Sequence, residues 1–352
     1  MIYFCYAIIK PTTVITESLK VADKSEIHFG RVTELLPRLL PECRVVVITD
    51  ANIDRRYHAL LQRYEYIMIG TGETVKTLHT VDTIYRRFIE MGIDRSCFVL
   101  GIGGGIVTDV AGFVASTYMR GLRFGFVSTT LLGQVDASVG GKNGVNIDGY
   151  KNMVGTFTQP QFVICDVEML RTLPEREFRA GMAEIVKAGI IADRELFETV
   201  EHSTLESLRE DERLLDSIVM AAIKVKADIV DRDERESGER RKLNLGHTFA
   251  HAIEKYSSEM NHGEAVAVGT VMISHMAVKL GLLQAEKADR IERAMERLGF
   301  RTSAPVETKK LLKAIAKDKK SVADSIYLVL PIDIGHCEVR KMHIDEIAAC
   351  TE

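Results

Sequence analysis

The chain has 352 residues, of which 46% are hydrophobic and 27% are charged. This length predicts about two domains, and the apolar content is sufficient for buried cores. The net charge of −4 gives no sign of nucleic-acid or anionic-membrane binding, and no apolar run is long enough to span a bilayer.

The first residues, MIYFCYAIIK (1–10), are apolar but lack the basic segment and the small-residue cleavage site of a signal peptide. We expect an edge strand there. The six cysteines are scattered without a CxxC pair, which indicates reduced thiols in a cytoplasmic protein.

The chain then alternates β-branched runs with helical patterns up to about residue 165. Apolar residues at helical spacing predict a helix over 75–92. Strand–helix alternation with continuous apolar strands is typical of an α/β domain with a largely parallel sheet. The predicted strands are 44–50, 64–70, 97–105, 122–130 and 161–166.

Polar or glycine-rich loops follow three of these strands. GIGGG (101–105) ends one strand and opens a helix, Asp50 ends another, and GTGETVKT (70–77) follows a third. Glycines let the backbone approach a pyrophosphate at a helix N-terminus, although the spacing is not GxGxxG and Asp50 precedes the glycines. A tight turn explains one such loop, but three at one sheet edge favour a dinucleotide site.

Strands nearly vanish after residue 170. Helices are predicted at 176–192, 195–231, 244–256, 263–280, 285–298 and 307–317, with one late strand at 325–335. We therefore expect a Rossmann-like α/β domain, residues 1–170, followed by an all-α C-terminal domain, residues 171–352. A cleft between two such domains is a favoured ligand position.

Basic residues lie beside glycines or inside apolar stretches, despite the negative net charge. Each of them alone fits a solvated side chain, but six together predict a pocket for a small, multiply anionic ligand. Glu184 lies three residues before Lys187, and the simplest interpretation is an ion pair on the helix surface. However, the surrounding apolar residues would partly bury both side chains. A buried carboxylate needs a cation or a metal ion beside it. The six are Arg120, Lys142, Lys151, Lys187, Lys226 and Arg240.

Three histidines lie in the segment LNLGHTFAHAIEKYSSEMNHGEAVAVG (243–269). The i,i+4 spacing places His247 and His251 on one helix face, as in many zinc pairs. His262 opens a second predicted helix. The residues alone leave open which of the three would bind a metal ion.

Several ordered motifs between residues 45 and 340 closely resemble the 3-dehydroquinate synthases. They are GIGGGIVTDVAGFVASTYMRG, VGGKNGVN, KNMVGTFTQP, RAGMAEIVKAG, DERESGERRKLNLGHTFAHAIE, NHGEAVAVG and KDKKSVADSIYLVLPIDIG. The resemblance implies a cytoplasmic, homodimeric lyase of the shikimate pathway, with NAD and a zinc (or cobalt) ion in the interdomain cleft.

The implied reaction converts 3-deoxy-D-arabino-heptulosonate 7-phosphate to 3-dehydroquinate and phosphate. Its steps would be transient oxidation at C5 by NAD, β-elimination of phosphate, re-reduction, ring opening and an intramolecular aldol closure. One mechanism would therefore need the cations, the dinucleotide loops and the metal ligands together.

By motif position, the resemblance also implies three sets of site residues. The metal ligands would be Glu184, His247 and His262. The cofactor positions would be Asp50, Thr71, Gly72, Glu73, Thr74, Val75, Lys76, Gly104, Gly105, Asp109, Thr129, Thr130, Lys142, Lys151, Met169, Leu170, Arg171 and Thr172. The catalytic positions on the substrate side would be Arg120, Asp136, Lys142, Lys151, Asn152, Lys187, Lys226, Arg240, Asn244, His251 and one of Lys319 and Lys320, of which we take Lys320.

Three alternatives remain. A metal-dependent polyol dehydrogenase would need NAD and a metal ion but has no use for six cations. Another sugar phosphate cyclase would act on a different substrate, although Lys226, His251 and the DKK sequence favour dehydroquinate synthase. A non-catalytic binding protein would not need the aligned metal residues. In each case we expect a small-molecule ligand, with no nucleic-acid or membrane partner.

Overall fold

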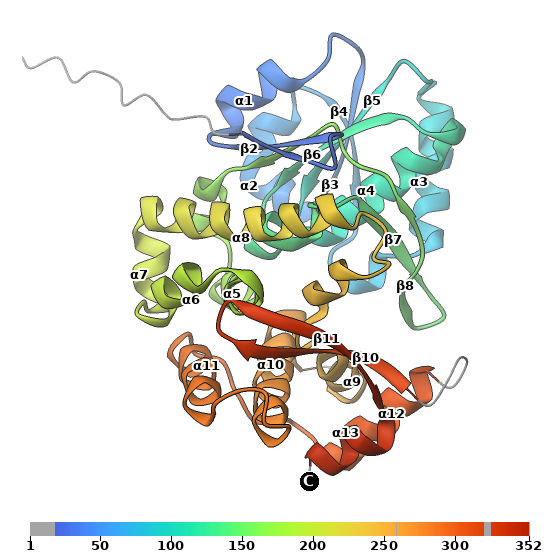
Figure 1. Cartoon of the computed structure of the whole chain (residues 1–352). Helices are drawn as coiled ribbons and strands as arrows, with labels where there is room; N and C mark the ends of the chain where they lie inside the picture. The colour runs from blue at the N-terminus through green and yellow to red at the C-terminus, as the bar shows by residue number, and fades with distance from the viewer. Residues whose placement is uncertain (1–17, 258, 320–324, 352) are drawn as a thin grey trace, which may run out of the picture.

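The computed structural model describes residues 18–257, 259–319 and 325–351. The edge strand expected at residues 1–10 and the candidate Lys320 lie outside the described residues. Figure 1 shows an α/β part and a helical part, with helix α8 (Glu212–Arg232) lying between them. Within the described ranges, no helix combines the length and the apolar character needed to cross a bilayer.

The α/β part is built on a seven-stranded sheet with the order β1-β2-β9-β6-β5-β3-β4. Its neighbouring strands pair parallel, except for the antiparallel pair β1–β2 at one edge. The largely parallel sheet expected from the sequence is confirmed, whereas β1 and β2 were not predicted. The strands are β1 (Ser18–Val21), β2 (Ser25–Phe29), β3 (Val45–Asp50), β4 (Glu65–Ile69), β5 (Phe98–Gly103), β6 (Arg123–Ser128) and β9 (Phe162–Cys165).

Both faces of the sheet are covered, as the central strand β3 illustrates. Successive residues of a strand point to opposite faces. Val46 packs in one core cluster with Phe88, while Val47 packs in the other with Leu36. Two helices line each face: α1 (Val32–Leu39) and α2 (Ala51–Leu61) on one side, α3 (Leu78–Glu90) and α4 (Gly105–Thr117) on the other.

The second half of the chain is mainly helical, as expected. However, the single helix predicted over 195–231 is wrong, because the structure has three helices there. Thr204 and Asp211 begin two of them, since their side chains accept hydrogen bonds from backbone N–H groups of the following turn. The helices are α5 (Glu175–Ala192), α6 (Arg194–Glu201), α7 (Leu205–Glu210), α8, α9 (His247–Tyr256), α10 (His262–Lys279), α11 (Ala285–Arg297), α12 (Thr308–Lys319) and α13 (Ile344–Thr351).

Two antiparallel hairpins complete the fold. In the first, β7 (Lys142–Ile147) and β8 (Tyr150–Phe157) are joined by Asp148 and Gly149, which adopt the positive φ angles of 48° and 80° that such a turn requires. In the second, the expected strand at 325–335 forms β10 (Ser325–Asp333) and pairs with an unpredicted strand, β11 (His336–His343). The C-terminal half is therefore helical with one hairpin, rather than entirely helical.

Candidate active site

The loops expected to bind a dinucleotide meet at one edge of the sheet. Because β3, β4, β5 and β6 run parallel, their carboxyl ends lie side by side. Asp50 ends β3 and caps α2, since its Oδ1 accepts hydrogen bonds from the backbone N–H groups of Asn52 and Ile53, at 2.8 and 3.1 Å. The other candidates at this edge are the 71–76 loop with the short helix η1 (Glu73–Val75), Gly104, Gly105, Thr129 and Thr130.

The GIGGG loop leaves no room for side chains. A Cβ atom added to Gly104 would lie 2.8 Å from Thr130 Cγ2, and one added to Gly105 would lie 2.9 Å from Ala137 Cβ. Gly105 is the first residue of α4, whose free N–H groups and dipole favour an anion. This loop therefore suits a phosphate group.

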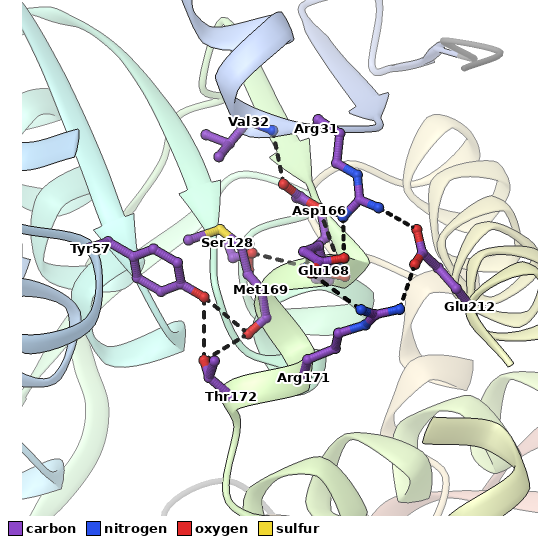
Figure 2. A network of polar contacts seen from close by, with 11 residues as sticks. Arg31, Val32, Tyr57, Ser128, Asp166, Glu168, Met169, Arg171, Thr172 and Glu212 are labelled. Atoms are coloured by element: carbon purple, nitrogen blue, oxygen red, sulfur yellow. Dashed lines mark hydrogen bonds and ion pairs between the residues drawn. The ribbon is translucent and has the colours of Figure 1, made fainter. Parts of the chain in front are cut away.

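Four further cofactor candidates follow β9, in the short helix η4 (Val167–Thr172), and Figure 2 shows the polar network around them. The Thr172 hydroxyl lies 3.3 Å from the Tyr57 hydroxyl. Arg171 instead reaches toward α8, where its Nη2 donates to Glu212 at 3.0 Å. Met169, Leu170, Arg171 and Thr172 thus share the strand-end edge, but the Arg171 side chain is engaged in ion pairs.

Three side chains from three helices form a group that could hold a metal ion. Glu184 lies in α5, while His247 and His262 are the first residues of α9 and α10, and their ligand atoms lie within 4.8 Å of one another. Glu184 Oε1 lies 3.8 Å from His247 Nε2 and 3.7 Å from His262 Nε2. This oxygen is buried and has no hydrogen-bond partner among the described residues.

The donor set fits a zinc ion of the catalytic type. One carboxylate and two imidazoles, bound tetrahedrally at ordinary zinc distances, would lie about 3.4 Å apart, close to the separations seen here. A buried carboxylate oxygen without a partner is costly unless a cation occupies the space beside it. Glu184, His247 and His262 therefore could hold a divalent metal ion, and their role as ligands stays a prediction.

Neighbouring groups orient both imidazole rings. His247 Nδ1 lies 3.1 Å from the carbonyl oxygen of Leu245, and His262 Nδ1 lies 3.3 Å from Glu254 Oε1. Such contacts direct Nε2 of each ring toward a metal position. The ring centroid of His251 lies 5.6 Å from that of His247, but His251 is not among the three residues whose ligand atoms lie together, so it is a neighbour of the group.

The charges of the group follow from burial and from the surrounding cations. Burial and the nearby Lys187 lower the pKa of His247 to about 3, so this imidazole is neutral. Burial also opposes charge on His262, but the neighbouring carboxylates of Glu184 and Glu254 raise its pKa to about 9. The pKa of Glu184 would rise on burial, but Lys187 holds it at about 2. A proton on His262 and a metal ion would therefore compete for the same lone pair.

Two buried lysines face this group. Lys187 pairs with Glu184 one helical turn away, and both side chains are at most 4% exposed. Lys226 on α8 pairs with Asp136, which lies in the π-helical turn η3 (Gly133–Ala137) of the α/β part. Lys226 and Lys187 outweigh burial and hold the pKa of Asp136 well below its usual range. Two of the six cations expected from the sequence, Lys187 and Lys226, thus lie beside the candidate metal group, each balanced by a carboxylate.

The β7–β8 hairpin brings two further lysines to the same region. Lys142 pairs with Glu236, which also accepts a hydrogen bond of 2.5 Å from Asn244 Nδ2. Lys151 Nζ lies 3.0 Å from Glu254 Oε1. Both lysines are about half exposed, so their charges remain accessible to an anionic ligand.

Lys76 links the dinucleotide edge to the hairpin. It pairs with Asp109 of α4, and its Nζ lies 2.6 Å from Asn152 Oδ1. Burial raises the pKa of Asp109 to about 6, although Lys76 opposes the shift. The buried Arg240, in the short helix η5 (Glu239–Asn244), donates from Nη2 to the Gly140 carbonyl oxygen at 2.9 Å.

The last of the six cations is Arg120, and two carboxylates join the candidate residues. Arg120 is exposed at the end of the short helix η2 (Tyr118–Arg120), with a left-handed φ of 69°. The sequence analysis did not single out Glu236 and Glu254, which neutralise the hairpin lysines. The available signal for Glu254 was its position seven residues after His247, which places both on one helix face.

Comparison with known proteins relates this site to a family. Residues 66–180 match the family model described as 3-dehydroquinate synthase N-terminal, and residues 181–321 match that described as 3-dehydroquinate synthase C-terminal. The chain belongs to the 3-dehydroquinate synthase family. The resemblance inferred from the motifs is thereby confirmed.

Relatives in this family align with most of the chain. The 3-dehydroquinate synthase of Synechococcus sp. is 41% identical over 310 residues, which cover 84% of each chain. That of Halorhodospira halophila is 45% identical over 276 residues, which cover 78% of each chain. Among solved structures, a 2-epi-5-epi-valiolone synthase from Streptomyces hygroscopicus, with NAD+ and Zn2+ bound, superposes with a TM-score of 0.84 at 26% identity, covering 98% of each chain.

Proposed function

We propose that this enzyme converts 3-deoxy-D-arabino-heptulosonate 7-phosphate to 3-dehydroquinate and phosphate, as a lyase that depends on NAD and on a divalent metal ion, zinc or cobalt. The observation that carries the proposal is the Glu184–His247–His262 group, surrounded by paired lysines at the end of a dinucleotide-type sheet. Membership of the 3-dehydroquinate synthase family supports the same assignment.

NAD and the metal ion would each supply chemistry that the side chains of the protein cannot. When bound, NAD supplies a reversible hydride acceptor and the metal ion supplies a Lewis acid, which together acidify a C–H bond beside a transient ketone. Glu184, His247 and His262 would hold the metal ion. The loops after β3, β4, β5 and β6 would hold the dinucleotide, with its diphosphate at the N-terminus of α4.

The substrate is anionic at its carboxylate and at its phosphate, and the cations of this chain suit both. Lys151, Lys226 and Arg240 would bind these oxygens and orient the sugar, since ammonium and guanidinium groups form strong charge-assisted hydrogen bonds. His251 on α9 would hydrogen-bond the substrate or relay a proton, because an imidazole exchanges protons near neutral pH. Holding the phosphate beside C6 would let one of its oxygens accept the C6 proton as the C7–O bond breaks, so that the C6=C7 double bond forms and hydrogen phosphate leaves.

The direct test is a turnover assay with limiting cofactor. Purified protein is incubated with zinc, the heptulosonate phosphate and NAD at far less than one equivalent of the substrate, and inorganic phosphate is measured over time. Because hydride returns to the product, many phosphates should be released per NAD without growth of the NADH absorbance. NADH formed in step with product would instead identify a net dehydrogenase.

We also propose the larger organisation that the resemblance implies. An NAD-binding domain of residues 1–170 would precede a metal- and substrate-binding domain of residues 171–352. The active protein would be a cytoplasmic homodimer, which sedimentation of the purified chain would test.

A further inference from the structure

Glu254 contacts two functional candidates with one oxygen atom. Its Oε1 lies 3.3 Å from His262 Nδ1 and 3.0 Å from Lys151 Nζ. The carboxylate side chain is only 9% exposed. It lies on α9 two helical turns after His247, on the same helix face.

The geometry points to Glu254 as a positioning residue that fixes the His262 ring for metal binding and ties Lys151 of the β7–β8 hairpin to the metal group. This inference rests on the proposed function only in taking Glu184, His247 and His262 as the metal site. Glu254 itself would not touch the metal ion, because the oxygen described faces Nδ1 of His262, on the side of the ring away from Glu184.

The contact to His262 sets which nitrogen faces the metal position. His262 begins α10 and its side chain is 30% exposed, so a hydrogen-bond partner for Nδ1 adds to what packing does to fix the ring. Donation from Nδ1 to a carboxylate keeps the Nε2 lone pair pointing toward Glu184 Oε1, 3.7 Å away. A carboxylate partner also makes the imidazole a stronger donor to a metal ion.

The contact to Lys151 joins parts of the chain that are distant in sequence. The hairpin is a two-stranded ribbon, and the Lys151 side chain is 49% exposed, so this ion pair is a tether between β8 and α9. A carboxylate as buried as Glu254 needs cationic or donor partners, and His262 and Lys151 supply them. Loss of Glu254 would therefore disturb both the metal site and the placement of Lys151.

The test measures zinc affinity without substrate or NAD, by competition with a chromophoric chelator. The variants are Glu254→Ala, Glu254→Gln and the control Glu201→Gln, which removes another largely buried carboxylate that pairs with Arg290 at 2.6 Å in the helical part. We expect zinc affinity to fall about 10- to 100-fold in Glu254→Ala, and less in Glu254→Gln because its amide oxygen can still accept from Nδ1. Glu201→Gln should stay within about twofold of the unsubstituted protein.

A Lys151→Met variant separates the two contacts. Its zinc affinity should stay within about twofold, because the His262 contact remains, while KM for the heptulosonate phosphate rises. At saturating zinc, Glu254→Gln should show a similar rise in KM. The double variant Lys151→Met/Glu254→Gln should have a KM close to that of either single variant. If Glu254→Ala misfolds, as circular dichroism would show, the nearly isosteric Glu254→Gln carries the test.

Unchanged zinc affinity in a folded Glu254→Gln and Glu254→Ala would overturn the inference. So would an equal loss of affinity in Glu201→Gln, which would make the effect one of general stability. Because zinc affinity is measured without turnover, a protein that shows the expected affinities but releases no phosphate would contradict the proposed reaction and leave the role of Glu254 intact.

Discussion

Lys226 on α8 donates to two oxygens of Asp136, with Nζ 2.6 Å from the carbonyl oxygen and 2.5 Å from Oδ1. The lysine side chain is 11% exposed and the carboxylate 30%. The pair joins the α/β part of the chain to the helical part, directly beside the candidate metal group.

The first prediction concerns this pair. Lys226→Met should leave the Asp136 carboxylate without its main cation and lower the free energy of unfolding by about 3 kcal/mol, because breaking a buried pair is costly. Denaturant unfolding measures this loss. The double variant Lys226→Met/Asp136→Asn should recover part of it, since no charge is then left unpaired. Additive losses in the double variant would show that the two side chains do not interact.

The second prediction concerns the histidines. His247→Ala and His262→Ala should lose bound zinc and activity together, because each removes one of three ligands. His251→Ala should keep close to one zinc per chain and lose most of its turnover. Metal analysis of the purified variants decides this, and His275→Ala is the control, because His275 is half-exposed and pairs with Glu292 instead. Zinc lost from His251→Ala but retained by His262→Ala would contradict the assignment.

The third prediction concerns pH and the carboxylates beside the network of Figure 2. Burial and the neighbouring Glu212 raise the pKa of Asp216 to about 6, with Asp166 adding to the shift and Arg31 opposing it. A raised pKa means that the folded state binds the proton more tightly than the unfolded state. Stability from this group is therefore present below about pH 4 and is lost as the pH rises through about 6.

Asp216→Asn removes this dependence. The variant should match the unsubstituted protein at pH 4 and have the larger free energy of unfolding at pH 7.5, as measured by denaturant titration at both values. Asp216 and Asp228 both lie in α8, and Asp228 is exposed. Asp228→Asn therefore controls for the loss of one negative charge. An equal gain in Asp228→Asn would assign the effect to overall charge.

The fourth prediction concerns helix packing behind the metal group. A Cβ atom on Gly263 would lie 2.2 Å from the backbone oxygen of Ala180, so Gly263→Ala must push α10 away from α5. This displaces His262 from Glu184 and costs about 1–3 kcal/mol through overpacking. Zinc content and thermal unfolding of the variant test this, and a stable variant with full zinc would show that the helices adjust without moving the ligands.

The sequence predicted local features well and tertiary partners poorly. Strands β3, β4, β5, β6 and β9 were predicted because each is a short apolar run bounded by polar loops, as in VVVITD, which ends at Asp50. The β7–β8 hairpin was missed because its residues, such as Lys142 and Asn152, are polar and were considered only as ligand contacts. Its strands are stabilised by one another and by α4, not by a continuous apolar run.

In the candidate site, too, contacts within one helix were predicted and contacts between elements were not. Glu184 and Lys187 were noticed because an ion pair in an apolar helix must be buried, and the structure buries both. Glu254 was missed because a carboxylate late in an amphipathic helix looks like part of a solvated face. Its partners, Lys151 and His262, come from other elements, and such contacts become visible only when the chain is folded.

The three candidate ligands lie in separate helices, Glu184 within α5 and the two histidines at the starts of α9 and α10, so no local segment contains the whole set. An unfolded chain would lack the site and would bind zinc only weakly, whereas docking of these helices creates it. Free zinc would then act as a folding ligand, adding about 2.7 kcal/mol to stability at one hundred times its dissociation constant. In a cell, the supply of metal would thus influence how much of this enzyme survives proteolysis, as well as how fast each molecule works.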